Sequence, residues 1–188
     1  MKTFIALALD PALVGRLEVE LKRLTRSAPG SKAVSTSSLH LTLAFLGEGP
    51  DALVPALQGV VEQVAKKYPP HVLTLKGTGT FGPMEAPKVL WVGIGGAIEP
   101  LNLLQKGVAQ ALAPLGLAPD HAVFHPHITL ARTKAPRGDP ALHRVASELR
   151  NTTFGELSVT HLTLFASEIA RDGLRYMPLA HHPLTGRP

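Results

Sequence analysis

A histidine two residues before a threonine, inside an apolar segment, occurs three times in this sequence. The segments are SSLHLTLAFLG (Ser37–Gly47), HPHITLAR (His125–Arg132) and THLTLFAS (Thr160–Ser167). An imidazole can accept or donate a proton near neutral pH, and a neighbouring hydroxyl can donate a hydrogen bond to an anionic oxygen. The pattern is therefore typical of acid–base chemistry on an anion, provided that the fold brings two of the histidines together.

In a β-strand, residues two apart lie on the same face, so His40 shares a face with Thr42 and His127 shares a face with Thr129. In-line displacement at phosphorus needs one group to take a proton from the incoming oxygen and another to give a proton to the departing oxygen. Two histidines supply both groups, and the threonine hydroxyls can bind the non-bridging oxygens. Arg132 adds positive charge at this face if its strand ends or bulges, because its odd spacing from His127 otherwise points it away.

The elements that must position these residues follow from hydrophobic periodicity. We expect strands over residues 3–9, 39–46, 71–76, 89–94, 127–132, 157–165 and 174–179. Asp51 and Asp139 are expected as helix caps, the second followed by a proline at the first helical position. Four helices are expected with these buried faces: Leu13, Leu17, Leu21 and Leu24; Leu53, Val54, Leu57, Val60, Val61 and Val64; Leu101, Leu104, Val108 and Leu112; Leu142, Val145 and Leu149.

The order strand, helix, histidine-bearing strand, helix, strand occurs twice along the chain. We therefore predict an α+β fold, bilobal and pseudo-symmetric, with an antiparallel sheet in each half lining a central cleft and the helices outside. The expected unit is a single domain over residues 1–188, with approximate repeat halves 1–87 and 88–188. A pseudo-twofold axis then brings His40 and His127 to opposite sides of one cleft. His161 has no such counterpart and is expected in the middle of its strand, so we interpret it as structural.

Composition limits the class of protein. The chain has 188 residues, of which 45% are hydrophobic and 18% charged, as in folded domains with a sizeable core. The absence of cysteine excludes disulfides, thiolate nucleophiles and cysteine zinc sites, and makes the cytoplasm the default compartment. No segment predicts a membrane span, and a monomer without an obligate protein partner is expected. The formal net charge of +5 favours anionic partners such as nucleic acid, although it also fits a generic soluble surface.

Two further patterns suggest other kinds of site. GTGTFG (Gly77–Gly82) spells a dinucleotide-binding motif, but prolines and a strand follow where a helix is needed, so we predict a glycine-rich loop. His121, His125 and His127 suggest a metal site, but Asp120 is the only nearby carboxylate and no metal is expected.

RNA binding without catalysis is the alternative function. The positive charge and the expected cleft are compatible with it. The aromatic residues do not form a ladder along the sequence, however, and Trp91 is expected in the buried core. Stacking of single strands is therefore not supported.

An ordered set of motifs resembles the two-histidine phosphoesterases, in the branch of RNA 2′,3′-cyclic phosphodiesterases that are also called 2′-5′ RNA ligases. The set comprises TFIALAL near the start, LHLTLAFLGE (Leu39–Glu48), VLWVGI (Val89–Ile94), FHPHITLAR (Phe124–Arg132) and LFASEIARDGLRYMPL (Leu164–Leu179). The resemblance extends over nearly the whole chain.

This resemblance implies that His40 with Thr42 and His127 with Thr129 are the catalytic residues. His40 is then the proton donor to the departing O3′, and His127 is the proton acceptor from water. The implied substrate is RNA or a nucleotide with a 2′,3′-cyclic phosphate, and the product is a 2′-phosphomonoester. No metal and no cofactor are implied, which agrees with the ring strain of a cyclic phosphate. The resemblance also implies 2′-5′ RNA ligase activity, as the reverse direction of the reaction at the same site.

Overall fold

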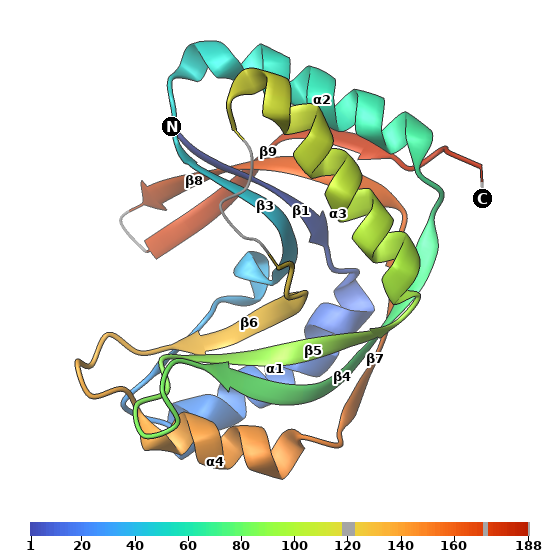
Figure 1. Ribbon diagram of the computed structural model, residues 1–188. Coiled ribbons are helices and arrows are strands. Elements are labelled where there is room, and N and C mark those ends of the chain that lie inside the picture. Colours follow the sequence, from blue (N-terminus) through green and yellow to red (C-terminus); the bar gives the residue numbers. More distant parts are fainter. Residues whose placement is uncertain (118–122, 171–172, 188) are drawn as a thin grey trace.

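The computed structural model describes residues 1–117, 123–170 and 173–187 (Figure 1). Within these residues the fold contains four α-helices and nine strands. The helices are α1 (Pro11–Ser27), α2 (Val54–Lys67), α3 (Ile98–Leu112) and α4 (Pro140–Leu149), and the strands are β1 (Lys2–Ala8), β2 (Lys32–Ala33), β3 (His40–Glu48), β4 (His71–Phe81), β5 (Val89–Gly96), β6 (His127–Arg132), β7 (Thr153–Val159), β8 (His161–Ala170) and β9 (Gly173–Pro183).

The strands form one antiparallel sheet in the order β7-β4-β5-β6-β3-β1-β8-β9, with the short β2 beside β6. Among the described residues, β3 and β6 share a single register pair, Leu41 with Ile128. The sheet therefore divides at this point into two halves, and Figure 1 shows that it curls strongly there. This arrangement confirms the predicted α+β class.

Helices cover the outer side of both halves (Figure 1). Helix α2 packs against β8, β9 and α3, and α3 also contacts β3, whereas α1 contacts β6 and β7, and α4 contacts β4 and β5. Both sequence segments 1–87 and 88–188 therefore contribute strands and helices to each half of the sheet. The internal repeat itself stays a prediction.

The predicted leucine faces account for this packing. The expected faces of α1, α3 and α4 are all buried, and so are most residues of the α2 face, all against the apolar side of the sheet. Asp139 caps α4, as predicted, by accepting a hydrogen bond from the backbone N–H of Ala141 at 3.0 Å. The expected cap at Asp51 is wrong, because this residue begins a short 3₁₀ helix and α2 starts at Val54.

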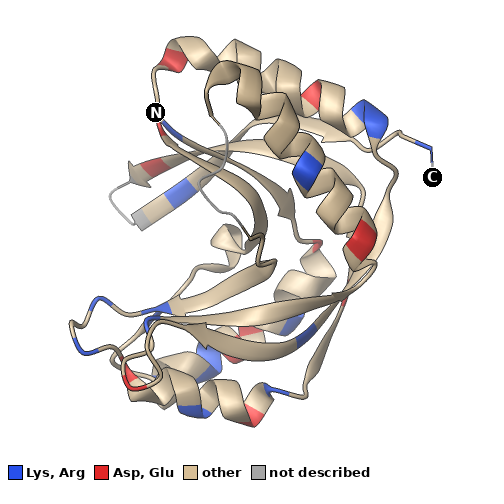
Figure 2. Ribbon diagram, in the orientation of Figure 1, with Lys and Arg blue, Asp and Glu red and all other residues tan. Residues whose placement is uncertain are grey.

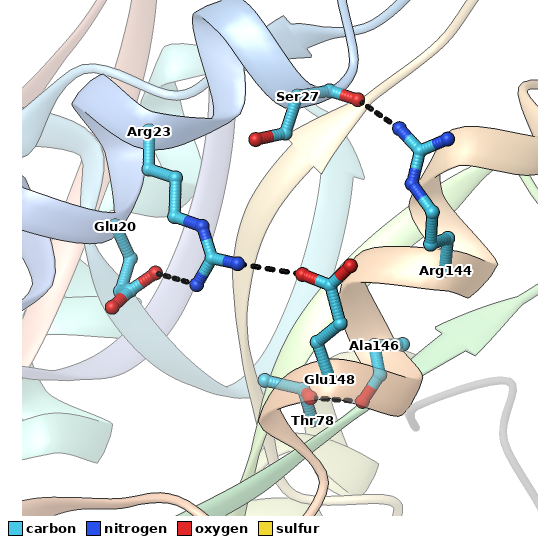
Figure 3. A network of polar contacts seen from close by, with 7 residues as sticks. All are labelled: Glu20, Arg23, Ser27, Thr78, Arg144, Ala146 and Glu148. Atoms are coloured by element: carbon cyan, nitrogen blue, oxygen red, sulfur yellow. Dashed lines mark hydrogen bonds and ion pairs between the residues drawn. The ribbon is translucent and has the colours of Figure 1, made fainter.

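Polar contacts fix α4 to α1 and to β4 (Figure 3). Arg23 forms an ion pair with Glu148 at 2.6 Å. Arg144 donates to the backbone carbonyl of Ser27 at 2.8 Å, and the Thr78 hydroxyl donates to the carbonyl of Ala146 at 2.7 Å. These bonds hold the outer layer of the half-sheet that contains β6.

One strand prediction and one loop prediction were wrong. The expected strand 157–165 is broken at Thr160, because β7 pairs with β4 in one half of the sheet and β8 pairs with β1 in the other. His161 is therefore the first residue of a strand, not the middle of one. The predicted loop at Gly77–Gly82 belongs almost entirely to β4, which continues to Phe81 and remains paired with β5 beyond an irregularity.

Charged residues lie mostly on the helices and connecting loops, and Figure 2 shows that the strands carry few of them. No helix in the described parts of the chain has the length and the apolar character needed to cross a membrane.

Candidate active site

His40 and His127 open β3 and β6, the two central strands. Each ring donates a hydrogen bond from Nδ1 to the backbone carbonyl two residues earlier, His40 to Ser38 and His127 to His125, both at 2.7 Å. A carbonyl can only accept, so both rings carry a proton on Nδ1. No described residue hydrogen-bonds to Nε2 of either ring, and this nitrogen is therefore available for proton transfer in both.

The antiparallel pair Leu41 with Ile128 sets how the two motifs meet. Continued by one residue in each direction, this register places His40 opposite Thr129 and His127 opposite Thr42, all on the same face of the sheet. The structure brings together all four residues that the sequence analysis singled out.

Both central strands bulge one residue after the threonine. The register with the neighbouring strand skips Leu43 in β3 and Leu130 in β6. A bulge turns the next side chains to the opposite face. This is the condition under which Arg132 reaches the histidine face, and its Nη2 donates to Thr129 Oγ1 at 3.3 Å.

Burial and positive charge act together on both imidazoles. Burial is the main cause that lowers the pKa of His40 from 6.5, opposed by its bond to Ser38 and helped by the charges of Arg132 and His127. Burial likewise lowers the pKa of His127 from 6.5, opposed by the bond to the carbonyl of His125 and helped by Arg132. The free protein therefore favours neutral rings, and a bound phosphate anion would restore protonation.

A cleft of about 400 Å³ opens on this face, and Thr42, His127 and Arg132 are among its lining residues. Its other walls are mainly apolar or aromatic: Leu43, Phe45, Phe81, Gln105, Val123, Phe124 and His125. Cationic and hydroxyl groups thus lie next to a mainly apolar space. Such a cleft suits a ligand with one anionic end and one apolar end.

Aromatic rings enclose both histidines, which the sequence analysis did not foresee. The His40 ring lies 4.7 Å from Phe4 and 5.1 Å from Tyr176, measured between centroids. His127 lies 4.8 Å from Phe81 and 6.4 Å from Trp91. Tyr176 comes from β9, which is distant from β3 in the order of the sheet, so sequence proximity gave no signal for it.

Trp91 was expected in the buried core, but it does not lie there. Its neighbours Leu90 and Val92 are fully buried in the core, and by strand alternation the indole lies on the opposite face, with the catalytic candidates. Phe81 and Trp91 are separated in sequence but lie next to each other on this face, with ring centroids 5.3 Å apart, and the sequence analysis did not foresee this pairing.

His161 lies apart from this group. Its Nδ1 is hydrogen-bonded to the hydroxyl of Thr160 at 2.9 Å, and its ring stacks on His181 with centroids 4.3 Å apart. These contacts are local to β8 and β9. A structural role for His161 stays a prediction.

No group of three potential metal ligands occurs among the described residues. Of the suggested metal site, His121 and Asp120 lie outside the described residues. His125 and His127 are described, and the carbonyl of the first accepts the Nδ1 proton of the second.

Comparison with known proteins agrees with this geometry. Residues 13–169 match the family described as the 2′-5′ RNA ligase superfamily. A protein of Aeropyrum pernix named RNA 2′,3′-cyclic phosphodiesterase is 32% identical over 89% of this chain and 94% of its own length. A protein of Escherichia coli with the same name is also 32% identical, over 87% of this chain and 86% of its own length.

Solved structures show the same fold. The crystal structure of TT0787 of Thermus thermophilus covers 100% of both chains with a TM-score of 0.83 and 29% identity. The structure of E. coli LigT complexed with 3′-AMP covers 98% of both chains with a TM-score of 0.76 and 26% identity. By sequence match and by fold, this chain belongs to the 2′-5′ RNA ligase superfamily.

Proposed function

We propose that this protein is an RNA 2′,3′-cyclic phosphodiesterase, a hydrolase in which His40 and His127 act as general acid and general base on one phosphate. The observation that carries the proposal is the matched pair of imidazoles on adjacent antiparallel strands. Each is fixed through Nδ1 and has a free Nε2. The names of the relatives from A. pernix and E. coli support the same reaction.

The reaction opens the cyclic phosphate by attack of water. Water oxygen bonds to phosphorus while His127 Nε2 takes one of its protons. The bond from phosphorus to O3′ breaks, and His40 Nε2 gives its proton to that oxygen. The products are a free 3′-hydroxyl and a 2′-phosphomonoester, and one proton has passed from His40 to the product and one from water to His127. The assignment of acid and base follows the family resemblance, since both rings have equivalent hydrogen bonds.

Thr42, Thr129 and Arg132 bind the non-bridging oxygens in this proposal. The hydroxyl groups lie on the histidine face, and Arg132 already contacts the hydroxyl of Thr129. Burial is the main cause that lowers the pKa of both histidines, and the charge of Arg132 adds to it. Burial raises the pKa of Tyr176, and the charge of Arg132 partly opposes this rise. Arg132 is therefore close enough to all three rings to stabilise charge on a phosphate between the histidines.

The proposal includes no metal ion and no cofactor, because the strained five-membered ring needs less electrophilic assistance. We further propose that the protein is a cytoplasmic monomer that acts on RNA ends or nucleotides. The positive net charge of +5 supports an anionic substrate. The reverse reaction, joining a 2′-phosphate end to form a 2′-5′ bond, is available at the same site by microscopic reversibility.

Product analysis with an oligonucleotide that ends in a 2′,3′-cyclic phosphate tests the proposal. We expect a 2′-phosphomonoester, formed at the same rate with and without EDTA. Chromatography against authentic 2′- and 3′-phosphate standards distinguishes the two directions of ring opening. Tight binding of the oligonucleotide without turnover would instead support the RNA-end-binding alternative.

A further inference from the structure

Phe81 lines the cleft next to the candidate catalytic group. Its ring stands at 87° to the imidazole of His127, with centroids 4.8 Å apart. We propose that Phe81, supported by Trp91, is the surface on which the nucleobase of the bound nucleotide stacks. The inference rests on the proposed function, because it requires the phosphate to lie at the histidines.

Trp91 supports Phe81 within the sheet. The two ring centroids are 5.3 Å apart, and the planes are inclined by 40°. The indole lies across the neighbouring strand at Gly79, its register partner. A Cβ atom at Gly79 would overlap Cζ2 and Cη2 of Trp91, so only glycine accommodates the ring in this position. The glycine-rich segment that resembled a dinucleotide-binding loop therefore serves to seat an aromatic ring.

The indole nitrogen of Trp91, Nε1, is buried and makes no hydrogen bond with the described residues. A buried N–H without a partner is unfavourable, and a buried tryptophan usually finds one. The contacts of Trp91 with Phe81 and with the backbone position of Gly79 are made by its flat ring.

The opposite side of the cleft is apolar as well. Phe45 occupies the position in β3 that Arg132 occupies in β6, after the equivalent bulge, and it is 58% exposed. An exposed phenylalanine that lines a cleft next to cationic groups is typical of a binding surface. Phosphate-binding groups at one end and aromatic rings at the other match a nucleotide, whose phosphate and flat base are joined by a short ribose.

Stacking on an aromatic ring accepts any base, since every base has a π-face. We therefore expect Phe81 to contribute affinity for nucleotides in general, with purines bound more tightly than pyrimidines because of their larger rings. Replacing such a ring weakens binding roughly 5- to 100-fold for each stacked base.

Trp91 is the only tryptophan in the sequence and reports directly on its surroundings. In the wild-type protein we expect adenosine 2′-monophosphate to change the fluorescence of Trp91, and inorganic phosphate to leave it nearly unchanged while competing for the same site. If adenosine 2′-monophosphate binds but changes the fluorescence of Trp91 no more than inorganic phosphate does, the proposal is overturned. This test needs only the wild-type protein.

Calorimetric titration of variants provides the second test. Phe81→Ala and Phe81→Leu should weaken binding of adenosine 2′-monophosphate roughly 5- to 100-fold and change binding of inorganic phosphate by less than about twofold. Phe81→Tyr should bind like wild type. Phe81→Leu is the matched control for apolar volume, because it keeps a large apolar side chain and removes the π-face.

The outcomes separate this inference from the proposed function. Wild-type affinity in Phe81→Leu would show that only apolar volume matters, and an equal loss for phosphate and nucleotide would show that Phe81 merely positions His127. Either result overturns the stacking assignment. A further outcome is that the wild-type protein binds nucleotide through Phe81 as expected and yet fails to hydrolyse adenosine 2′,3′-cyclic phosphate. That result would refute the proposed function and leave the stacking assignment intact.

Discussion

In the proposed mechanism the two nitrogens of His40 have separate roles, and substitution can distinguish them. In His40→Asn the side-chain amide can keep the hydrogen bond to the carbonyl of Ser38, which is 2.7 Å in the wild type, but nothing replaces Nε2. His40→Ala removes both nitrogens and the ring contacts to Phe4 and Tyr176. Asparagine should therefore preserve the local structure without supporting proton transfer.

The expected magnitudes follow from these contacts. Loss of general acid catalysis lowers the rate by about 10²- to 10⁴-fold, equivalent to about 3 to 5 kcal/mol of barrier, in both variants. A net contribution of about 0.5 to 1.5 kcal/mol from the hydrogen bond should make His40→Asn more stable than His40→Ala by about 1 kcal/mol. Hydrolysis of adenosine 2′,3′-cyclic phosphate measures the loss of rate. Urea unfolding with unchanged m values measures the difference in stability between the two variants.

The same pair of variants at His127 provides the matched control, because its Nδ1 bond to the carbonyl of His125 is equivalent. His127→Asn should lose activity to a comparable degree. A rate close to wild type in either asparagine variant would refute the reasoning, since it would show that Nε2 of that ring takes no part in proton transfer.

Further predictions concern charge, packing and the third histidine. Arg132→Gln should move the pH optimum of kcat/KM upward, because Arg132 lowers the pKa of both His40 and His127, and the pH profiles of the variant and the wild type measure this. Gly79→Ala should destabilise the fold by about 1 to 3 kcal/mol in urea through its clash with Trp91. Gly95→Ala is its control, because there the nearest atom is 3.8 Å from the added Cβ, and equal losses at both glycines would contradict the argument. His161→Ala should lower stability and leave turnover intact, and loss of turnover without unfolding would disprove its structural role.

Most of the site could be predicted because its signals are local. Strand alternation placed each histidine on the face of its own threonine, and this depends on neighbouring residues alone. The odd spacing of Arg132 from His127 allowed it to reach this face only if the strand ended or bulged, and a bulge is present at Leu130. The leucine faces of the helices were found for the same reason.

The remainder depends on contacts between distant segments. The ring of Tyr176 in β9 contacts that of His40 although β1 and β8 lie between their strands in the sheet, and no local pattern reveals this contact. The break at Thr160 arises because β7 and β8 pair with different strands, although their sequence reads as one apolar run. The expected core position of Trp91 was wrong, since a period of two does not tell which face of a strand is buried.

The order of acid and base also lies beyond the sequence and the geometry of the free protein. Both rings open a strand, bond the carbonyl two residues earlier, and have a lowered pKa. Because the active form needs one protonated and one neutral ring, the profile of kcat/KM should be bell-shaped with its maximum below pH 6.5, the ordinary histidine value that both rings fall below.

Nuclear magnetic resonance titration of the imidazole nitrogens with inorganic phosphate tests the central claim most directly. If one anion lies between the two rings, a single phosphate per chain must raise the pKa of His40 and of His127 together, with one common dissociation constant. A response confined to one ring, or two independent binding events, would contradict the claim that both histidines act on the same phosphorus.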